Sequence, residues 1–442
     1  MGKSASWALV AALAGFLFGF DTAVISGAEQ AVQAEWAMSD LLHGLAISAA
    51  LWGTVIGALT AGSPLDRLGR KQTLIWIGVL YALSAIGSAL AWDPVSFMLF
   101  RFIGGLGVGA SSVAAPAYIA EIAPRESRGR LVALFQTMIV LGILIAYLSN
   151  FALGGLGGEA WRWMLGAEVL PAVAYLLATF LIPESPRWLM VNRGEEAHAR
   201  TILQTINPAT VDETVAAIRF EAESEARQIS WGKFFSGSLK RPIMLAFLIA
   251  MFNQLSGINA IIYYAPRIFE LSGAGASVAL LATVGIGAIN LVFTLLGLML
   301  IDKAGRRFLL YLGSFGYIVS LGMTAYGFAS ERFELVLPFI LAFIAAHAIG
   351  QGAVIWVYIS EIFPSAARAK GQSLGAGTHW IFAAALTLVM PSVLASVAPV
   401  TIFLGFAGMM VLQLAWVHFA VFETRGQSLE EISRQNRTAN SG

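Results

Sequence analysis

The sequence predicts an all-helical integral membrane protein, with twelve transmembrane helices in two six-helix bundles and a cytoplasmic helical linker between them. Three observations predict this fold class. The 442-residue chain is 58% hydrophobic and only 12% charged, whereas a soluble chain carries about 25% charged residues. Apolar runs long enough to cross a bilayer recur along the chain. Short motifs of the first half also return in the second half at nearly constant spacing.

Twelve apolar runs have the length of a membrane span, six in each half of the chain. They are expected near 7–28, 42–63, 73–92, 95–122, 131–153, 163–182, 243–271, 276–301, 308–330, 335–362, 371–395 and 399–421. The first run is too long for a signal peptide and contains a charge, so cleavage of a leader is not expected.

Three motifs show that the chain is an internal duplication. DRLGRK at 66–71 returns as DKAGRR at 302–307, 236 residues later. YIAEIAPRESRGR at 118–130 returns as YISEIFPSAARAK at 358–370, 240 residues later, and PESPR at 183–187 is echoed by FETRG after 239 residues. Parallel halves of this kind, with a site between them, are typical of transporters.

A charged stretch without a membrane-length apolar run separates the two halves. In it, Val211, Val215, Ile218 and Ala222 recur at helical spacing, which predicts an amphipathic helix. We expect this linker to brace the bundles, and a solvated linker without a role is the alternative. The expected segments are a first bundle at 1–186, the linker at 187–241, a second bundle at 242–424 and a cytoplasmic tail at 425–442.

The placement of positive charge predicts that both termini are cytoplasmic. Of the 27 Lys and Arg residues, only Arg162, Arg267 and Arg332 fall on outer loops or span ends, and Arg101 lies inside a span. The remaining 23 are on the inner side, as the positive-inside rule requires. Compact loops favour a bacterial inner membrane. Cysteine is absent, which excludes disulfides.

The inner loops carry acids as well as bases, and both recur in the two halves. Opposite charges at helix ends form ion pairs that hold helices together in one state and part in another, although exposed pairs are individually weak. The alternative is ordinary anchoring, but topology selects only Lys and Arg. The candidate cytoplasmic gate residues are Asp66, Arg67, Gly69, Arg70, Glu121, Arg128, Glu184, Arg187, Asp302, Gly305, Arg306, Glu361 and Arg368.

These motifs, together with QLSGIN at 254–259, resemble the sugar porter family of the major facilitator superfamily. The resemblance runs from GFLFGFDTAVISG at 15–27 to the tail, with the motifs in family order. Phe422 and Ala353 depart from the family pattern, which usually has proline at both places. The resemblance implies the major facilitator fold and transport of a sugar. The sequence shows no cofactor loop and no metal-ligand cluster, so no cofactor and no metal are expected.

Asp21 and Arg101 are the charges placed well inside the spans, whereas Glu168 is expected near a span end. Each of the pair lies seven residues from the outer end of its span, or about 10 Å deep. Equal depth and opposite sign predict that they meet, because an isolated charge in a bilayer is costly. An Asp that gains and loses an Arg changes its proton affinity with conformation, and a static pair is the alternative. In the sugar porters the matching Asp and Arg are linked to proton symport, which implies that these two residues couple proton and sugar.

The seventh span, FNQLSGINAIIYY at 252–264, carries neutral amides in an apolar helix. Amides match sugar hydroxyls without burying a charge, and aromatic rings match the C–H faces of a sugar. One buried amide more often joins two helices, but several amides with Trp favour a neutral polyol site. The candidate sugar contacts are Gln136, Asn253, Gln254, Asn259, Asn290, Gln351, Trp356, His379 and Trp380. The resemblance assigns sugar contact to five of these, which are Gln136, Gln254, Asn259, Asn290 and Trp356.

We therefore expect a proton-coupled symporter that imports a neutral hexose or pentose by alternating access. A facilitated uniporter for the same sugars and a transport-inactive sugar sensor are the alternatives. An enzyme is not expected, because the sequence shows no metal-ligand cluster, nucleophile–base pair or cofactor loop. The expected partners are the sugar, the proton and the lipid bilayer, with no nucleic acid, and the protein is expected to be a monomer.

Overall fold

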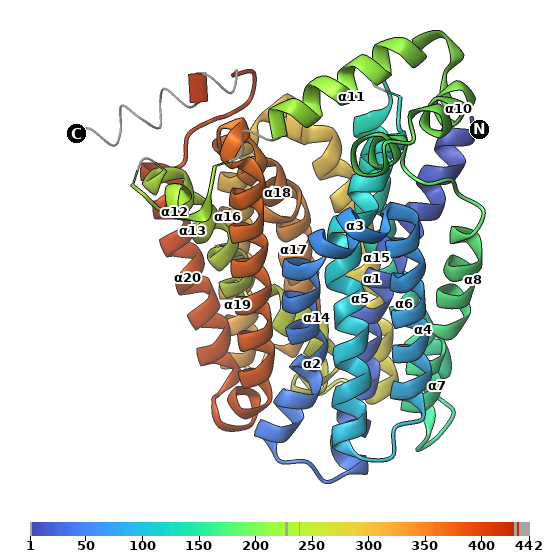
Figure 1. Ribbon diagram of the computed structural model, residues 1–442. Helices are drawn as coiled ribbons and strands as arrows, with labels where there is room; N and C mark the ends of the chain where they lie inside the picture. The colour runs from blue at the N-terminus through green and yellow to red at the C-terminus, as the bar shows by residue number, and fades with distance from the viewer. Residues whose placement is uncertain (1, 125, 226–228, 238, 428–430, 433–442) are drawn as a thin grey trace. The chain divides into compact units, whose positions relative to one another are not determined.

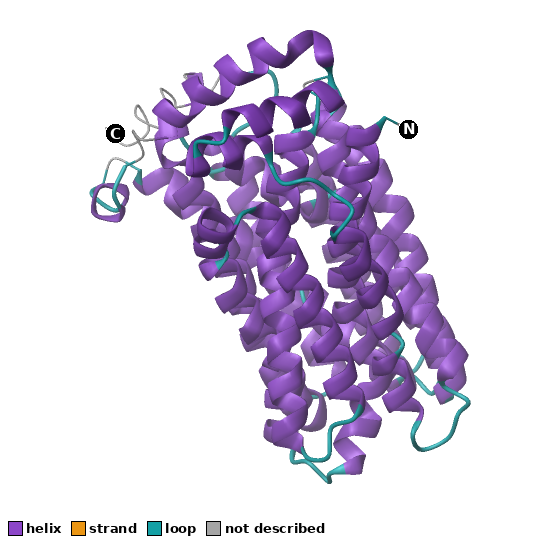
Figure 2. Cartoon of the chain, turned by 45° about the vertical axis from the view of Figure 1, so that its right-hand side comes forward, coloured by secondary structure: helices purple, strands orange, loops and turns teal. Residues whose placement is uncertain are grey.

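The computed structural model describes residues 2–124, 126–225, 229–237, 239–427 and 431–432. All regular structure in these ranges is helical, without a strand (Figure 1 and Figure 2). The predicted all-helical fold class is confirmed. Most of the predicted tail at 425–442 lies outside the described residues.

The chain divides into two compact units. Unit 1 comprises Met1–Val32 and Ala49–Arg227, and unit 2 comprises Gln33–Ser48 and Gln228–Gly442. The turn between the first two long helices therefore groups with unit 2, where Arg267 donates a hydrogen bond to the side-chain oxygen of Gln33 at 2.6 Å.

Most helices of the first half are labelled in Figure 1. The elements of this half are α1 (Lys3–Glu35), α2 (Asp40–Thr60), α3 (Gly62–Leu68), α4 (Arg70–Ala89), α5 (Pro94–Ile122), α6 (Arg128–Leu153), α7 (Ala160–Gly166), α8 (Val169–Thr179), α9 (Pro186–Trp188), a π-helix (Leu189–Arg193), α10 (Glu196–Ile206), a 3-10 turn (Pro208–Thr210) and α11 (Val211–Glu225).

The second half repeats the pattern of long helices. Its elements are α12 (Trp231–Phe234), α13 (Lys240–Leu255), α14 (Ile258–Leu271), α15 (Ala276–Ala304), α16 (Arg306–Ala329), a 3-10 turn (Phe333–Leu335), α17 (Val336–Ile349), α18 (Gln351–Ile362), a second 3-10 turn (Ser365–Ala367), α19 (Arg368–Ser396) and α20 (Pro399–Phe419).

Among the described residues, 11 helical stretches are long and apolar enough to cross a membrane. The sixth expected span, near 163–182, is formed instead by α7 and α8, each of which is too short by itself. Ala167 and Glu168 join these two helices with helical dihedral angles, so they follow one another as one span. The predicted count of twelve is consistent with this arrangement.

The predicted amphipathic helix of the linker is α11. Its apolar face buries Val211, Val215 and Ile218 against Leu203 of α10. An ion pair at 2.5 Å between Arg187 of α9 and Glu221 also holds α11 against α9. Apolar periodicity thus gives the linker a small core of its own within unit 1.

The main core described in unit 2 lies where α13, α16, α18 and α20 meet. Ile249, Leu310, Val354 and Val417, one from each helix, are fully buried there. Because α18 is surrounded by three other helices at this point, any polar group on its inner side needs a partner within the bundle. Polar site residues on α18, such as Gln351, are therefore expected to bond to neighbouring helices.

Candidate functional site

The two intramembrane charges of unit 1 form an ion pair. Nη1 of Arg101 on α5 donates to Oδ1 of Asp21 on α1 at 2.5 Å. Nη2 of Arg101 also donates to the main-chain oxygen of Asp21 at 3.2 Å. Both residues are only 1% exposed. The expected contact is therefore present, as the cost of an isolated charge in a membrane requires.

Glu168 joins this pair, which the sequence reasoning missed. It is 1% exposed and lies within hydrogen-bonding reach of Asp21 and electrostatic reach of Arg101. Within the described part of the chain, its Oε1 has no hydrogen-bond partner. The sequence did contain a signal for this contact. Glu168 lies five residues into its expected span, which is close to the depth of Asp21 and Arg101, although this position also counts as near the span end.

The Asp21–Arg101–Glu168 cluster has a simple charge balance. Two ionised carboxylates and one guanidinium leave one negative charge in excess, and a buried excess charge is costly. One bound proton removes that excess. The cluster is therefore suited chemically to hold a single proton and to release it when its surroundings change.

Neutral amides gather where α13 ends and α14 begins in unit 2. Gly257 interrupts the helix with φ of +87°, in the left-handed region that glycine tolerates best. Beyond this break, Nδ2 of Asn259 donates to Oε1 of Gln254 at 2.8 Å. Nε2 of Gln254 donates to Oδ1 of Asn253 at 3.0 Å and lies 3.1 and 3.2 Å from the ring nitrogens of His379. These four predicted contacts, called the amide cluster below, thus meet around Gln254.

Two indole rings flank the amide cluster. The ring centroid of Trp356 lies 5.1 Å from that of His379, and the Trp380 ring meets the His379 ring edge-on at 4.7 Å. Trp356 is 37% exposed, whereas Trp380 is buried. A group of donors and acceptors beside an accessible flat ring suits an uncharged polyol.

The other three predicted sugar contacts have different surroundings. Gln136 is half-buried on α6 of unit 1. Asn290 accepts a hydrogen bond of 3.4 Å from Thr294 one turn along α15. Gln351 is fully buried and donates to Gln413 at 2.5 Å. In the described residues, none of the three is hydrogen-bonded to the amide cluster.

A half-buried carboxylate caps α4 in unit 1. Glu184 accepts hydrogen bonds from the main-chain N–H groups of Arg70 at 2.9 Å and Lys71 at 3.1 Å. Gly69 precedes them with φ of +96°, and a Cβ there would stand 2.3 Å from Oε2 of Glu184. The Arg70 guanidinium pairs with Glu121 at 2.9 Å. Burial raises the pKa of Glu184, and the main-chain N–H groups partly offset this rise.

The same arrangement caps α16 in unit 2. Glu423 accepts from the main-chain N–H groups of Arg306 at 2.9 Å and Arg307 at 3.0 Å, after Gly305 with φ of +91°. Arg306 pairs with Glu361 at 2.8 Å. Burial raises the pKa of Glu423, but the main-chain N–H groups together bring it below its usual value. Glu423 was not among the predicted gate residues, although the FETRG echo of PESPR pointed to it.

The remaining gate candidates divide into two sets. Three join the same two networks, in the pairs Asp66–Arg70 at 3.9 Å, Asp302–Arg306 at 3.1 Å and Arg187–Glu121 at 4.0 Å. Three enter none of these pairs in the ranges that the structure describes, and they are Arg67, Arg128 and Arg368. Both networks lie within single units, so what the structure shows of them is helix capping and local pairing.

Gly69→Ala is expected to destabilise unit 1 more than Gly157→Ala. Both glycines have positive φ, so both alanines are strained, but nothing lies within 4 Å of a Cβ at Gly157. Only Gly69→Ala displaces Glu184 from α4. The extra loss should be roughly 1 kcal/mol, the usual worth of such a cap, or about 2–4 °C in Tm. Thermal unfolding of both purified variants checks this, and equal losses would contradict the capping role.

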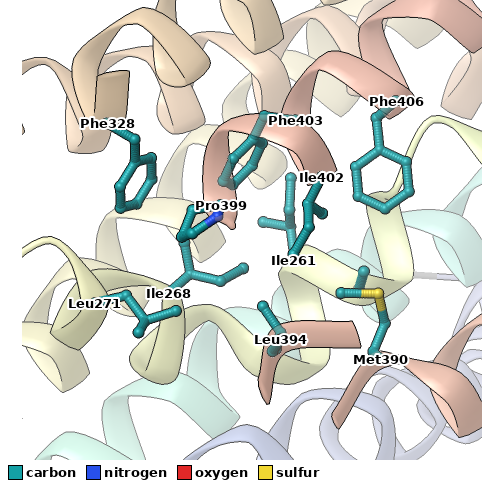
Figure 3. Close-up of a pocket in the computed structure, with 11 residues that line it drawn as sticks. Ile261, Ile268, Leu271, Phe328, Met390, Leu394, Pro399, Ile402, Phe403 and Phe406 are labelled. Atoms are coloured by element: carbon teal, nitrogen blue, oxygen red, sulfur yellow. The ribbon is translucent and has the colours of Figure 1, made fainter. Parts of the chain in front are cut away.

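A separate pocket in unit 2 does not match a sugar. It is bordered by α14, α16, α19 and α20, and its lining side chains are apolar, including Ile261, Phe328, Phe403 and Met390 (Figure 3). A sugar needs hydrogen-bond partners for its hydroxyls, and these side chains offer none. Across the described residues, no group of three or more His, Cys, Asp or Glu is placed to hold a metal ion.

Comparisons with known proteins identify the family of this chain. The family model for sugar (and other) transporters matches residues 7–435. The glucose transporter GlcP of Staphylococcus epidermidis is 35% identical, covering 97% of this chain and 96% of its own. The arabinose-proton symporter of Bacillus subtilis is also 35% identical, covering 96% and 93%.

Solved structures show the same fold. The inward open conformation of the xylose transporter XylE from E. coli has a TM-score of 0.86 and 31% identity, covering 97% of this chain and 98% of that one. A family match over almost the whole chain and relatives above 30% identity agree with the motifs and the helix count. The chain therefore belongs to the sugar porter family of the major facilitator superfamily.

Proposed function

We propose that this multi-pass membrane protein is a proton-coupled symporter that imports a neutral monosaccharide by alternating access. The observation that carries the proposal is the buried Asp21–Arg101–Glu168 cluster, an acidic group whose charge balance changes with one proton. A relative named as an arabinose-proton symporter supports the coupling. The names of other relatives, a glucose and a xylose transporter, support a monosaccharide cargo without deciding which one.

The two chemical tasks fall on different groups. Asp21 is the proton-binding residue, and Arg101 competes with the proton for its carboxylate. The amide cluster binds hydroxyls, and Trp356 offers a flat face to the sugar ring. Asn290 and Gln136 are further proposed sugar contacts, carried over from the resemblance. Proton and sugar binding together permit the switch between outward and inward access, after which both leave on the inner side.

The proposal also covers the location of the protein in the membrane and the roles of its segments. The charge asymmetry supports cytoplasmic termini and loops, so the networks around Arg70 and Arg306 lie at the cytoplasmic ends of their helices and serve as gates. We propose the segments that the sequence predicts, with bundles at 1–186 and 242–424, the linker at 187–241 and the tail at 425–442. We propose a monomer in a bacterial inner membrane.

Transport by the purified protein in liposomes tests the function. An inward proton gradient is expected to drive accumulation of at least one sugar among xylose, glucose, galactose, arabinose, fructose and inositol, and a protonophore should abolish that accumulation. Counterflow without a gradient identifies the cargo. Uptake that only equilibrates the sugar, with or without the gradient, would replace symport by uniport, and absence of counterflow for every sugar would leave only the sensor.

A further inference from the structure

The tenth span is broken directly before Gln351. α17 ends at Ile349 and α18 begins at Gln351, while Gly350 between them leaves the helical region with φ of −81° and ψ of −103°. A Cβ on Gly350 would stand 2.7 Å from Cα of Gly313 in α16. Helix α16 therefore lies against the break, and a larger residue at Gly350 would push it away.

A chain of hydrogen bonds crosses the bundle at this break. Nε2 of Gln351 donates to Oε1 of Gln413 on α20 at 2.5 Å, and Nε2 of Gln413 donates to Oγ of Ser314 on α16 at 2.7 Å. The Ser314 hydroxyl donates in turn to the main-chain oxygen of Leu310 at 2.7 Å. The three side chains are 0% exposed. Every bond in the chain points the same way, from α18 through α20 to α16.

Helix α18 is consequently attached to α16 at both of its ends. Its first residue is held through Gln413 and Ser314, and Glu361 in its last turn pairs with Arg306 at 2.8 Å. Between these two attachments lies Trp356, the ring that flanks His379. The orientation of that ring depends on where α18 begins, because the helix is short and its start is a break in the backbone.

The geometry does not favour Gln351 as a direct sugar contact. Trp356 is five positions further along the chain, which is about 140° around the helix, so the two side chains leave α18 in different directions. The Gln351 amide nitrogen already donates to Gln413, and its amide oxygen is buried and has no hydrogen-bond partner among the described residues. Because Gln351 is 0% exposed, a sugar stacked on the exposed Trp356 ring would reach it only if the packing around Gln351 opened.

We propose that Gln351 is a positioning residue for sugar binding, which acts through Gln413 and Ser314 to fix the start of α18 and so hold Trp356 beside the amide cluster. This inference rests on the proposed sugar transport. It changes the role of Gln351 from sugar contact to support, and it adds Gln413 and Ser314 to the residues that set sugar affinity. Neither glutamine takes part in proton binding.

The test compares Gln351→Met, Gln413→Met and the double variant, because methionine keeps the length of the side chain and removes its hydrogen bonds. Each single variant should raise the KM of the transported sugar by roughly three- to tenfold, the worth of one buried hydrogen bond, with Vmax nearly unchanged. The KM of the double variant should be no higher than that of either single variant, since no buried glutamine amide is left unpaired. Ser314→Ala, a milder change at the far end, should raise KM in the same direction.

Deoxy analogues of the sugar separate positioning from contact. A positioning residue changes KM by the same factor for every analogue, whereas a residue that binds one hydroxyl has no effect on the analogue that lacks it. The inference is overturned if Gln351→Met raises KM and Gln413→Met does not, if the two effects multiply in the double variant, or if no variant changes KM. Wild-type protein that neither binds nor transports any sugar would instead refute the proposed function, and the inference with it.

Discussion

Asp21→Asn is expected to abolish uphill accumulation of sugar while leaving sugar exchange intact. Asparagine keeps the shape of the side chain and an oxygen that can accept from Arg101, but it cannot take up a proton. Without a proton to carry, the ratio of internal to external sugar should fall to about one under an inward proton gradient. Uptake into liposomes measures accumulation, counterflow measures exchange, and a pH dye outside the liposomes measures proton movement with the sugar.

Asp93→Asn is the matched control for this variant. Asp93 caps α5 by accepting from the main-chain nitrogen of Ser96 at 2.6 Å, and asparagine caps a helix equally well. This change also removes one carboxylate from unit 1, but outside the spans, so accumulation should persist. Full accumulation by Asp21→Asn would contradict the role of that residue. If Glu168→Gln lost accumulation while Asp21→Asn kept it, the transported proton would belong to Glu168.

The fold was predictable because a bilayer imposes strong rules on sequence. A span requires a long apolar run, and a duplication leaves motifs at a fixed spacing, so the all-helical class and the placement of the spans followed from these two patterns. The sixth span divides into α7 and α8 at Ala167 and Glu168, between Gly166 and Pro171, so helix-weakening residues mark the division in the sequence although the apolar run does not. Hydropathy measures only the apolar character of a run and does not detect where a helix within it is interrupted.

The site was predictable to the extent that depth and residue type determine contact. Asp21 and Arg101 were paired from equal depth, and the same comparison applied to Glu168 would have added it. Gln254 and Asn259 lie about 140° apart on an unbroken helix, and it is the turn at Gly257 that brings their amides to 2.8 Å. Gln351 shows the opposite outcome, because its partner Gln413 lies 62 residues away and no local pattern records that contact.

Gln254→Leu is expected to weaken sugar binding more than any other single change in the amide cluster. The hydrogen bonds that hold the cluster together pass through Gln254, which accepts from Asn259 and reaches both Asn253 and His379. Leucine removes these bonds, leaves the buried Asn259 and the half-buried His379 without this partner, and offers nothing to a hydroxyl. Loss of two hydrogen bonds of roughly 1 kcal/mol each corresponds to an increase in Kd of roughly 30-fold.

The increase in Tm that saturating sugar produces is the direct measurement, because a ligand stabilises only the state that it binds. This increase should vanish in Gln254→Leu at sugar concentrations that stabilise the wild type. Gln372→Leu is the control, since Gln372 is exposed on α19, the helix that carries His379, and the same substitution there should leave the increase unchanged. If both variants respond to sugar as the wild type does, the amide cluster is a structural contact between helices. If only Gln254→Leu fails to respond, although its unliganded Tm remains within a few degrees of the wild type, the defect lies in binding, because a structural contact would have lowered the unliganded Tm first.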